Sequence, residues 1–130
     1  ILDTCAKWEG KGYVSVPRLE ESAQFADSTH AYYKLYVYVQ SDNLPKEWSR
    51  DRIIQEINDL GVPCFSGSAS EVYLEKAFDN TGLRPASTLP VAKQLGETSL
   101  MSLVHPTWTY DENKQTVQAI DSVFTKIHGQ

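Results

Sequence analysis

The sequence predicts an α+β fold, in which a short, mainly antiparallel sheet and helices packed on one of its faces form a small two-layer domain. The chain has 130 residues, 41% of them hydrophobic, which suits one domain that buries a core without disulfides or metals. Segments with a period of two alternate with segments with a period of three to four, and no internal repeat appears. Strands mixed with helices over this length favour helices on one face of a sheet.

The first segment is expected to be the end of a helix. Ile1 to Trp8 has apolar residues at loosely helical spacing with no capping residue before them, and glycines follow. The chain starts with isoleucine rather than methionine, so we expect a piece of a longer protein, with residues 1–12 as the tail of a truncated linking helix. Residues 13–130 then form a single domain. It begins with a strand over Tyr13 to Val16 and a polar loop from Glu20 to Thr29.

The clearest strand covers Ala31 to Gln40. Strict alternation predicts one apolar face and one tyrosine-rich face that is partly covered. The apolar face consists of Leu35, Val37 and Val39. After a turn-rich connection, Ser41 to Trp48, Ser49 is expected to cap a helix that Gly61 ends. Its apolar stripe consists of Ile53, Ile54, Ile57 and Leu60.

The middle of the chain is expected to hold a short strand and two helices. Val62 to Phe65 is extended in this interpretation, and Ser68 and Glu71 have the spacing of a capping box. That spacing predicts a short helix to about Phe78. Pro90 suits the first turn of a third helix, whose apolar residues are Val91, Ala92 and Leu95.

The last elements are a strand over Leu100 to Val104 and a closing amphipathic helix that reaches Ile127. Thr109 and Glu112 repeat the capping-box spacing at the start of this helix. Apolar residues follow at steps of three and four and predict the buried face. They are Val117, Ile120, Phe124 and Ile127.

Composition excludes several classes of function. A net charge of −5 without a basic cluster argues against nucleic-acid binding. Apolar runs of only a few residues predict no membrane span, and no signal peptide is visible. Cys5 and Cys64 are far apart in the sequence, which favours free thiols in a reducing compartment and hence a cytoplasmic protein.

The chain shows no self-contained chemistry. Its three histidines have no zinc-ligand spacing, so no metal site is predicted. His105 is interpreted as a hydrogen-bonded turn residue, with a general base as the alternative, and no nucleophile, base and orienting acid combine, so we assign no catalytic residue. Ser66-Gly67-Ser68, ahead of the predicted helix, is either an anion site or an ordinary loop and cap.

Several stretches between Ala31 and Ile127 carry a family resemblance by their order and spacing. They are the strand HAYYKLYVYV, the helix RDRIIQEINDLGV, the helix start Leu89-Pro90-Val91-Ala92 and the strand LMSLVHP, in which Leu103 stands where proline is usual. The chain resembles the C-terminal small domain of the DegT/DnrJ/EryC1/StrS family, which are fold-type I aminotransferases that depend on pyridoxal phosphate.

The resemblance implies a specific parent enzyme. In this family pyridoxal phosphate forms a Schiff base with a lysine of the large N-terminal domain. The amino group passes from an amino acid, typically glutamate, to a nucleotide-linked keto sugar in polysaccharide biosynthesis, and the enzyme is a homodimer. No lysine here matches that context, so the chain alone is expected to bind no cofactor and to be inactive.

One departure from the family concerns the substrate site. The family often carries His-Tyr-Pro after the turn that follows the Arg-Asp helix, where it helps to close the site over the nucleotide sugar. In this sequence the segment that begins at Val62 lacks the His-Tyr pair. By position, the resemblance nominates Phe65, Ser66, Ser68 and Tyr73 as substrate contacts. The alternative functions are a free-standing α+β module that binds a small ligand or regulates, and a protein-interaction domain.

Overall fold

The computed structural model describes residues 1–18, 28 and 30–130, so the predicted loop from Glu20 to Thr29 lies almost wholly outside the described residues. The helices are α1 (Leu2–Glu9), α2 (Arg50–Asp59), α3 (Pro90–Thr98) and α4 (Tyr110–His128). The strands are β1 (Val14–Ser15), β2 (Lys34–Val39), β3 (Cys64–Phe65) and β4 (Ser99–Leu103). Short 3₁₀ turns cover Ser41–Asn43, Val72–Leu74 and Lys76–Phe78.

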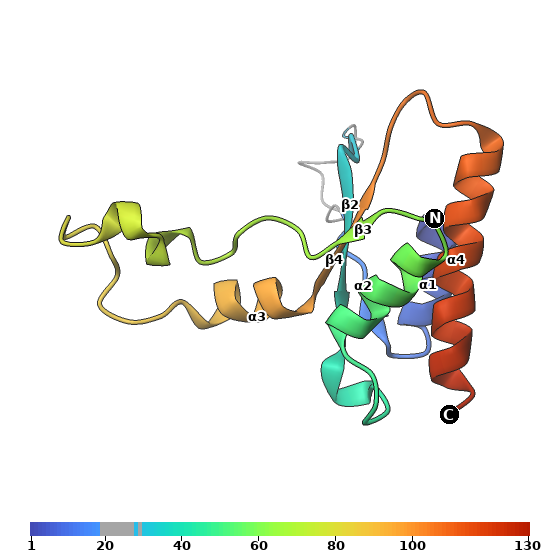
Figure 1. The fold of residues 1–130 in the computed structure, drawn as a ribbon, viewed down its shortest axis with the longest axis horizontal. Helices are drawn as coiled ribbons and strands as arrows, with labels where there is room; N and C mark the ends of the chain where they lie inside the picture. Colours follow the sequence, from blue (N-terminus) through green and yellow to red (C-terminus); the bar gives the residue numbers. More distant parts are fainter. Residues whose placement is uncertain (19–27, 29) are drawn as a thin grey trace.

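The strands form one antiparallel sheet in the order β1-β2-β4-β3. Its centre is the pairing of β2 with β4, from Lys34 opposite Leu103 to Tyr38 opposite Ser99. Helices α1, α2 and α4 lie on one side of this sheet, and the chain between β3 and β4, including α3, projects from the other side (Figure 1). The predicted α+β class with helices on one face is confirmed, with α3 as the exception.

The core lies between the sheet and the three helices. Leu35, Val37 and Val39 are buried, as the alternation predicts, and Tyr36 and Tyr38 on the other face are half-buried. Against the buried face pack residues of α2 and α4, of which Ile53 and Phe124 are among the largest fully buried side chains. Burial of one strand face is therefore what joins the two layers.

Strand β2 is shorter at its start than predicted. The expected strand begins at Ala31, but the structure begins it at Lys34. The reason is Tyr32, whose φ of 45° lies in the left-handed region that a strand residue does not adopt. Its backbone N–H donates to Nδ1 of His30, and the two rings stack with centroids 4.1 Å apart.

Helix α4 begins with the predicted capping box. The Thr109 hydroxyl accepts from the Glu112 backbone N–H at 3.3 Å, and the Glu112 carboxylate accepts from the Thr109 N–H at 2.7 Å. The predicted buried face is wrong at one position, because Thr116 is buried and Val117 is only half-buried. Thr116 tolerates burial because its hydroxyl donates to the Glu112 carbonyl at 2.9 Å within the same helix.

Helix α1 is packed into this core through Trp8. The Trp8 ring stacks on Phe124 of α4 with centroids 5.8 Å apart, and its indole N–H donates to the Asp121 carboxylate at 2.9 Å. The Lys7 ammonium reaches the same carboxylate at 2.6 Å. The first helix and the last are thus joined by one apolar and two polar contacts.

Thr109→Ala is expected to lower the free energy of unfolding by about 1 kcal/mol at neutral pH, because it removes the cap of α4. The backbone N–H and then the hydroxyl of Thr109 hold the pKa of Glu112 below its usual value of 4.5. A lowered folded-state pKa stabilises above the unfolded value and loses that effect as the pH falls through the folded value. The loss on mutation should therefore shrink below pH 4.5 in urea unfolding followed by circular dichroism.

The control for that measurement is Thr107→Ala. Thr107 precedes the helix and its hydroxyl contacts only the nearby His105 ring, at 2.7 Å. An equal loss of stability in the two variants would contradict the assignment of the cap.

Cys5 and Cys64 are expected to resist alkylation in the folded protein. Both are free and buried, and burial raises the pKa of each thiol to about 11. At pH 8 about one thiol in a thousand is then ionised, and the thiolate is the reactive form. Mass spectrometry after iodoacetamide treatment should show no adduct in the native protein and two in guanidinium chloride. Rapid double labelling of the native protein would contradict the packing of these two residues.

Candidate functional site

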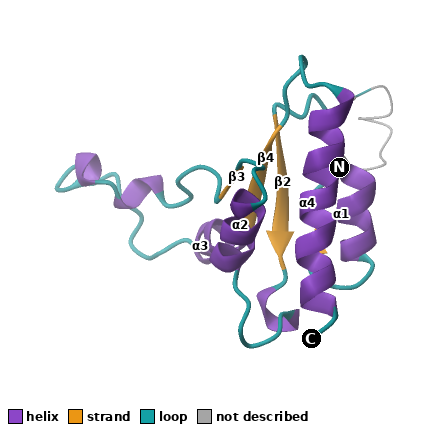
Figure 2. Cartoon of the chain, turned by 45° about the vertical axis from the view of Figure 1, so that its right-hand side comes forward, coloured by secondary structure: helices purple, strands orange, loops and turns teal. Residues whose placement is uncertain are grey.

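The most distinctive part of the molecule is a projecting segment, residues 66–98, which we call the arm. It leaves the sheet after β3, carries two 3₁₀ turns and α3, and returns at β4 (Figures 1 and 2). None of its residues is buried. The arm therefore has no hydrophobic core of its own, and its position depends on how its two ends are held.

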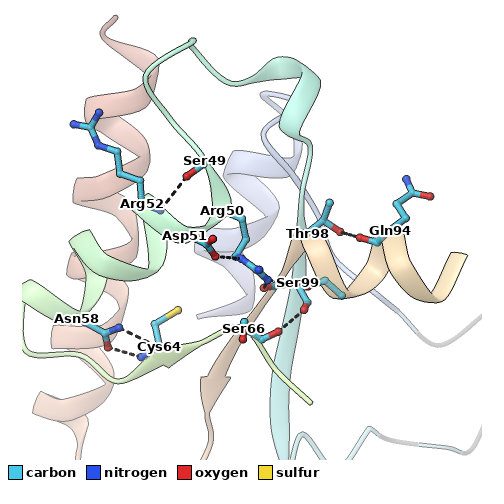
Figure 3. A network of polar contacts seen from close by, with 11 residues as sticks. Ser49, Arg50, Asp51, Arg52, Asn58, Cys64, Ser66, Gln94, Thr98 and Ser99 are labelled. Carbon is cyan, nitrogen blue, oxygen red and sulfur yellow. Dashed lines mark hydrogen bonds and ion pairs between the residues drawn. The ribbon is translucent and has the colours of Figure 1, made fainter. Parts of the chain in front are cut away.

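A polar network holds the two ends together at the arm root, which comprises Arg50, Ser66, Gly96 and Ser99. Figure 3 shows Arg50, Ser66 and Ser99 of this network from close by. The Ser99 hydroxyl donates to the Ser66 carbonyl at 2.5 Å, which joins the outgoing end to the returning one. The Arg50 guanidinium donates to the carbonyls of Gly96 and Ser99 at 2.9 and 3.0 Å. Only 15% of the Arg50 side chain is exposed. This first residue of α2 therefore links the helix layer to the arm through hydrogen bonds that are largely shielded from solvent.

Two glycines allow the close packing at this root. Gly67 has a φ of +89°, and a Cβ there would lie 2.7 Å from the Tyr36 ring. Gly96, in the last turn of α3, faces Ser70, and a Cβ there would lie 2.0 Å from the Ser70 hydroxyl. The outgoing chain thus crosses the tyrosine face of β2 and touches α3 at points where a side chain does not fit.

The predicted helix from Ser68 to Phe78 is wrong. Ser68 caps nothing, because its hydroxyl lies 3.4 Å from that of Tyr36, and the Glu71 carboxylate accepts from the Tyr73 hydroxyl at 2.7 Å. Both side chains of the expected capping box are engaged elsewhere, and only isolated 3₁₀ turns follow. The anion site proposed for Ser66-Gly67-Ser68 loses its basis, since no helix N-terminus faces it.

The structure brings three of the four nominated substrate residues to the arm root. Phe65, the last residue of β3, is 46% exposed, and Ser66 and Ser68 follow it. Tyr73 lies further along the arm, where its hydroxyl accepts from the Leu89 N–H at 2.9 Å. That bond lowers the pKa of Tyr73, but the Glu71 carboxylate, by its hydrogen bond and charge, together with burial outweighs it, so the pKa is raised.

A hollow of about 510 Å³ lies beside the arm root on the bare face of the sheet. Its described lining is aromatic and polar, with Tyr36, Tyr38, Lys34, His30 and Ser68 among its residues and no carboxylate. Such a lining can bind a polar ligand by stacking and hydrogen bonds. It offers no nucleophile, base and orienting acid in contact with one another.

No further chemistry emerges from the described residues. Among them no group of three or more histidine, cysteine or acidic side chains is placed to hold a metal ion. Within the same residues no helix has the length and hydropathy that crossing a bilayer requires. His105 is the expected turn residue, with Nδ1 accepting from the Thr107 N–H at 3.3 Å.

Sequence reasoning missed the residues that build the arm root. Arg50 looked like an ordinary helix residue, since its partners are carbonyl groups far along the chain. Gly96 did carry a signal, because glycine inside a predicted helix is unfavourable unless close approach requires it. Gly67 also indicated a turn, but its partner on β2 has no signature in the local sequence.

Gly67→Ala is expected to destabilise the fold more than Gly82→Ala does. Both glycines have positive φ, so both variants carry a left-handed strain of about 1–2 kcal/mol. Only Gly67 meets the Tyr36 ring, which adds about 1–3 kcal/mol of overpacking. Urea unfolding measures the difference, and Tyr36→Leu should remove the extra loss. Equal effects at both glycines would contradict the close approach to Tyr36.

Comparison with known proteins supplies what the geometry alone does not. No protein-family model and no curated protein matches the chain. Among solved structures, an aminotransferase from Psychrobacter cryohalolentis is 88% identical over 98% of this chain, with a TM-score of 0.93. The chain spans 32% of that protein's length.

Two more distant structures share the fold. NtdA from Bacillus subtilis, solved with bound cofactor PMP, is 17% identical, with a TM-score of 0.69 over 95% of this chain and 26% of its own. A DegT DnrJ EryC1 StrS aminotransferase from Brucella abortus is 18% identical, with a TM-score of 0.63 over 98% of this chain and 30% of its own. The resemblance is thereby confirmed: in sequence the chain matches a segment of an aminotransferase, and in fold it is similar to the C-terminal part of a DegT DnrJ EryC1 StrS aminotransferase.

Proposed function

We propose that this chain is the C-terminal small domain of a pyridoxal-phosphate-dependent aminotransferase. The observation that carries the proposal is the 88% identity over 98% of the chain to a segment that is 32% of an aminotransferase. The enzyme would transfer an amino group from glutamate to a nucleotide-linked keto sugar in polysaccharide biosynthesis. In this proposal it is a cytoplasmic homodimer, and residues 1–12 continue a helix that links the two domains.

The described residues do not fit pyridoxal phosphate. The cofactor needs a lysine amine in an enclosed pocket, a partner for its ring nitrogen and a cradle for its phosphate. Lys34 lines the hollow, but the hollow opens to solvent, its lining among the described residues includes no carboxylate, and the Lys34 ammonium lies 5.6 Å from the centre of the Tyr33 ring. We therefore place the cofactor in the large N-terminal domain, and we propose that this chain binds none by itself.

The role left to this chain is to shape a wall of the substrate site. The helix layer supports the sheet, and the arm root holds Phe65, Ser66 and Ser68 beside the tyrosine face of β2. These side chains offer hydroxyl groups and one aromatic ring, which suit a sugar and its phosphates. We keep Phe65, Ser66, Ser68 and Tyr73 as the proposed substrate contacts, and we assign no catalytic residue.

The alternative of a free-standing ligand-binding module has lost its main support. It rested on an anion site at the start of a helix after Ser68, and that helix is absent from the described arm. It remains separable by experiment, because it predicts that residues 1–130 alone bind a nucleotide sugar in calorimetry. A fragment of an enzyme site should bind such a ligand feebly once the other walls are gone.

The complete gene product is expected to purify with visible absorbance from pyridoxal phosphate. Glutamate should abolish that absorbance, and a nucleotide-linked keto sugar should restore it as the amino group leaves the protein. Residues 1–130 mixed with pyridoxal phosphate are the control and should show neither change. A complete product that stays colourless with added cofactor would overturn the proposal.

A further inference from the structure

The arm has apolar side chains on its outside and polar bonds in its interior, the opposite of a normal small domain. Most of the exposed large apolar side chains in the described chain lie on it or at its root. They are Phe65, Val72, Leu74, Leu83, Leu89, Val91 and Leu95, with exposed fractions from 40% to 72%. The three helices on the other side of the sheet contribute far fewer. Clustered exposed apolar groups mark surfaces that a partner covers.

Polar bonds hold the arm's interior. The Arg84 guanidinium donates to the carbonyls of Tyr73, Leu74 and Glu75 at 2.8, 2.9 and 3.0 Å, and it pairs with Asp79 at 2.6 Å. One side chain thus binds two carbonyl groups of the first 3₁₀ turn and that of Glu75, which lies between the two turns. Because this polar centre uses the backbone, the apolar side chains are left to face outward.

The arm's charges are largely balanced within it. It carries four acidic and three basic residues, and Arg84 pairs with Asp79 while Lys93 lies 3.7 Å from Glu97. A surface with paired charges and exposed apolar groups suits an apolar partner more than a charged one. Ordering a residue costs roughly 1–2 kcal/mol, and within residues 1–130 no arm residue is fully buried to offset that cost.

We propose that the arm is a docking element whose outward apolar side chains pack on the part of the aminotransferase polypeptide outside residues 1–130, and that Arg84 folds the arm for this contact. The inference rests on the proposed function. The occupant follows from length, because a protein that is 88% identical over this segment has only 32% of its chain matched here. The remainder is the surface available to cover the arm.

Hydrogen exchange measured by mass spectrometry tests the contact directly. In residues 1–130 alone, arm amides should exchange much faster than those of β2 and α4, which are protected. In the complete enzyme, arm amides should exchange about tenfold more slowly or better, with β2 and α4 unchanged. Equal arm exchange in both would overturn the proposal, and so would arm protection in residues 1–130 that rises with concentration, which indicates a second copy.

Charge substitutions locate the contact on the arm. Leu83 and Val91 are 72% and 65% exposed, and Tyr110 at the start of α4 is 80% exposed. Leu83→Asp, Val91→Asp and the control Tyr110→Asp should leave the thermal midpoint of residues 1–130 unchanged. In the complete enzyme, the two arm variants should lose the protection of the arm and the control should retain it. Retained protection in both arm variants would overturn the docking surface.

Two variants, Arg84→Gln and Arg84→Lys, test whether Arg84 folds the arm for this contact. Arg84→Gln should raise arm exchange in the complete enzyme toward that of residues 1–130, and Arg84→Lys should recover only part of the protection, because an ammonium lacks the forked donors. Arg52→Gln is the control, since Arg52 lies over the Trp48 ring and away from the arm. Full protection in Arg84→Gln would overturn this role.

These readouts separate the inference from the proposed function. A protected arm in a complete protein that never binds pyridoxal phosphate would defeat the function and leave the docking intact. A coloured, active enzyme with a freely exchanging arm would do the opposite.

Discussion

The antiparallel pairing of β2 with β4 is the contact on which the rest of the structure depends. It joins two strands that lie far apart in the sequence. The chain between them must therefore start at the end of β2 and come back to the start of β4, beside it in the sheet. Helix α2 occupies the covered face, β3 takes the free edge of β4, and the remaining chain has only the bare face left. The arm is therefore a consequence of sheet order as much as of its own sequence.

Local sequence patterns predict the elements whose signals lie within a few residues. The alternation in β2 and the reciprocal cap at Thr109 are of this kind, because each interaction joins neighbours in the chain. Thr116 shows the limit of periodicity, since its burial depends on a hydroxyl that bonds within its own helix. The spacing of hydrophobic residues gives no information about such a hydrogen bond.

The arm and its root lie beyond local prediction for a physical reason. The Ser68 to Glu71 spacing fits a capping box, but Tyr36 from a different strand lies against the Ser68 hydroxyl. Arg50 likewise finds its partners at the end of α3 and the start of β4. Phe65 and Ser66 lie at the root, where distant residues position them, and their role as substrate contacts stays a prediction.

The two outer strands carry a further consequence. Each of β1 and β3 is two residues long, so each outermost strand offers few free backbone groups of its own, while Lys34 to Val37 of β2 extend past the pairing with β1. Long, flat edges invite strands of other chains to add on, and short ones offer them almost no ladder. The two outermost strands therefore give a strand of another chain little to pair with.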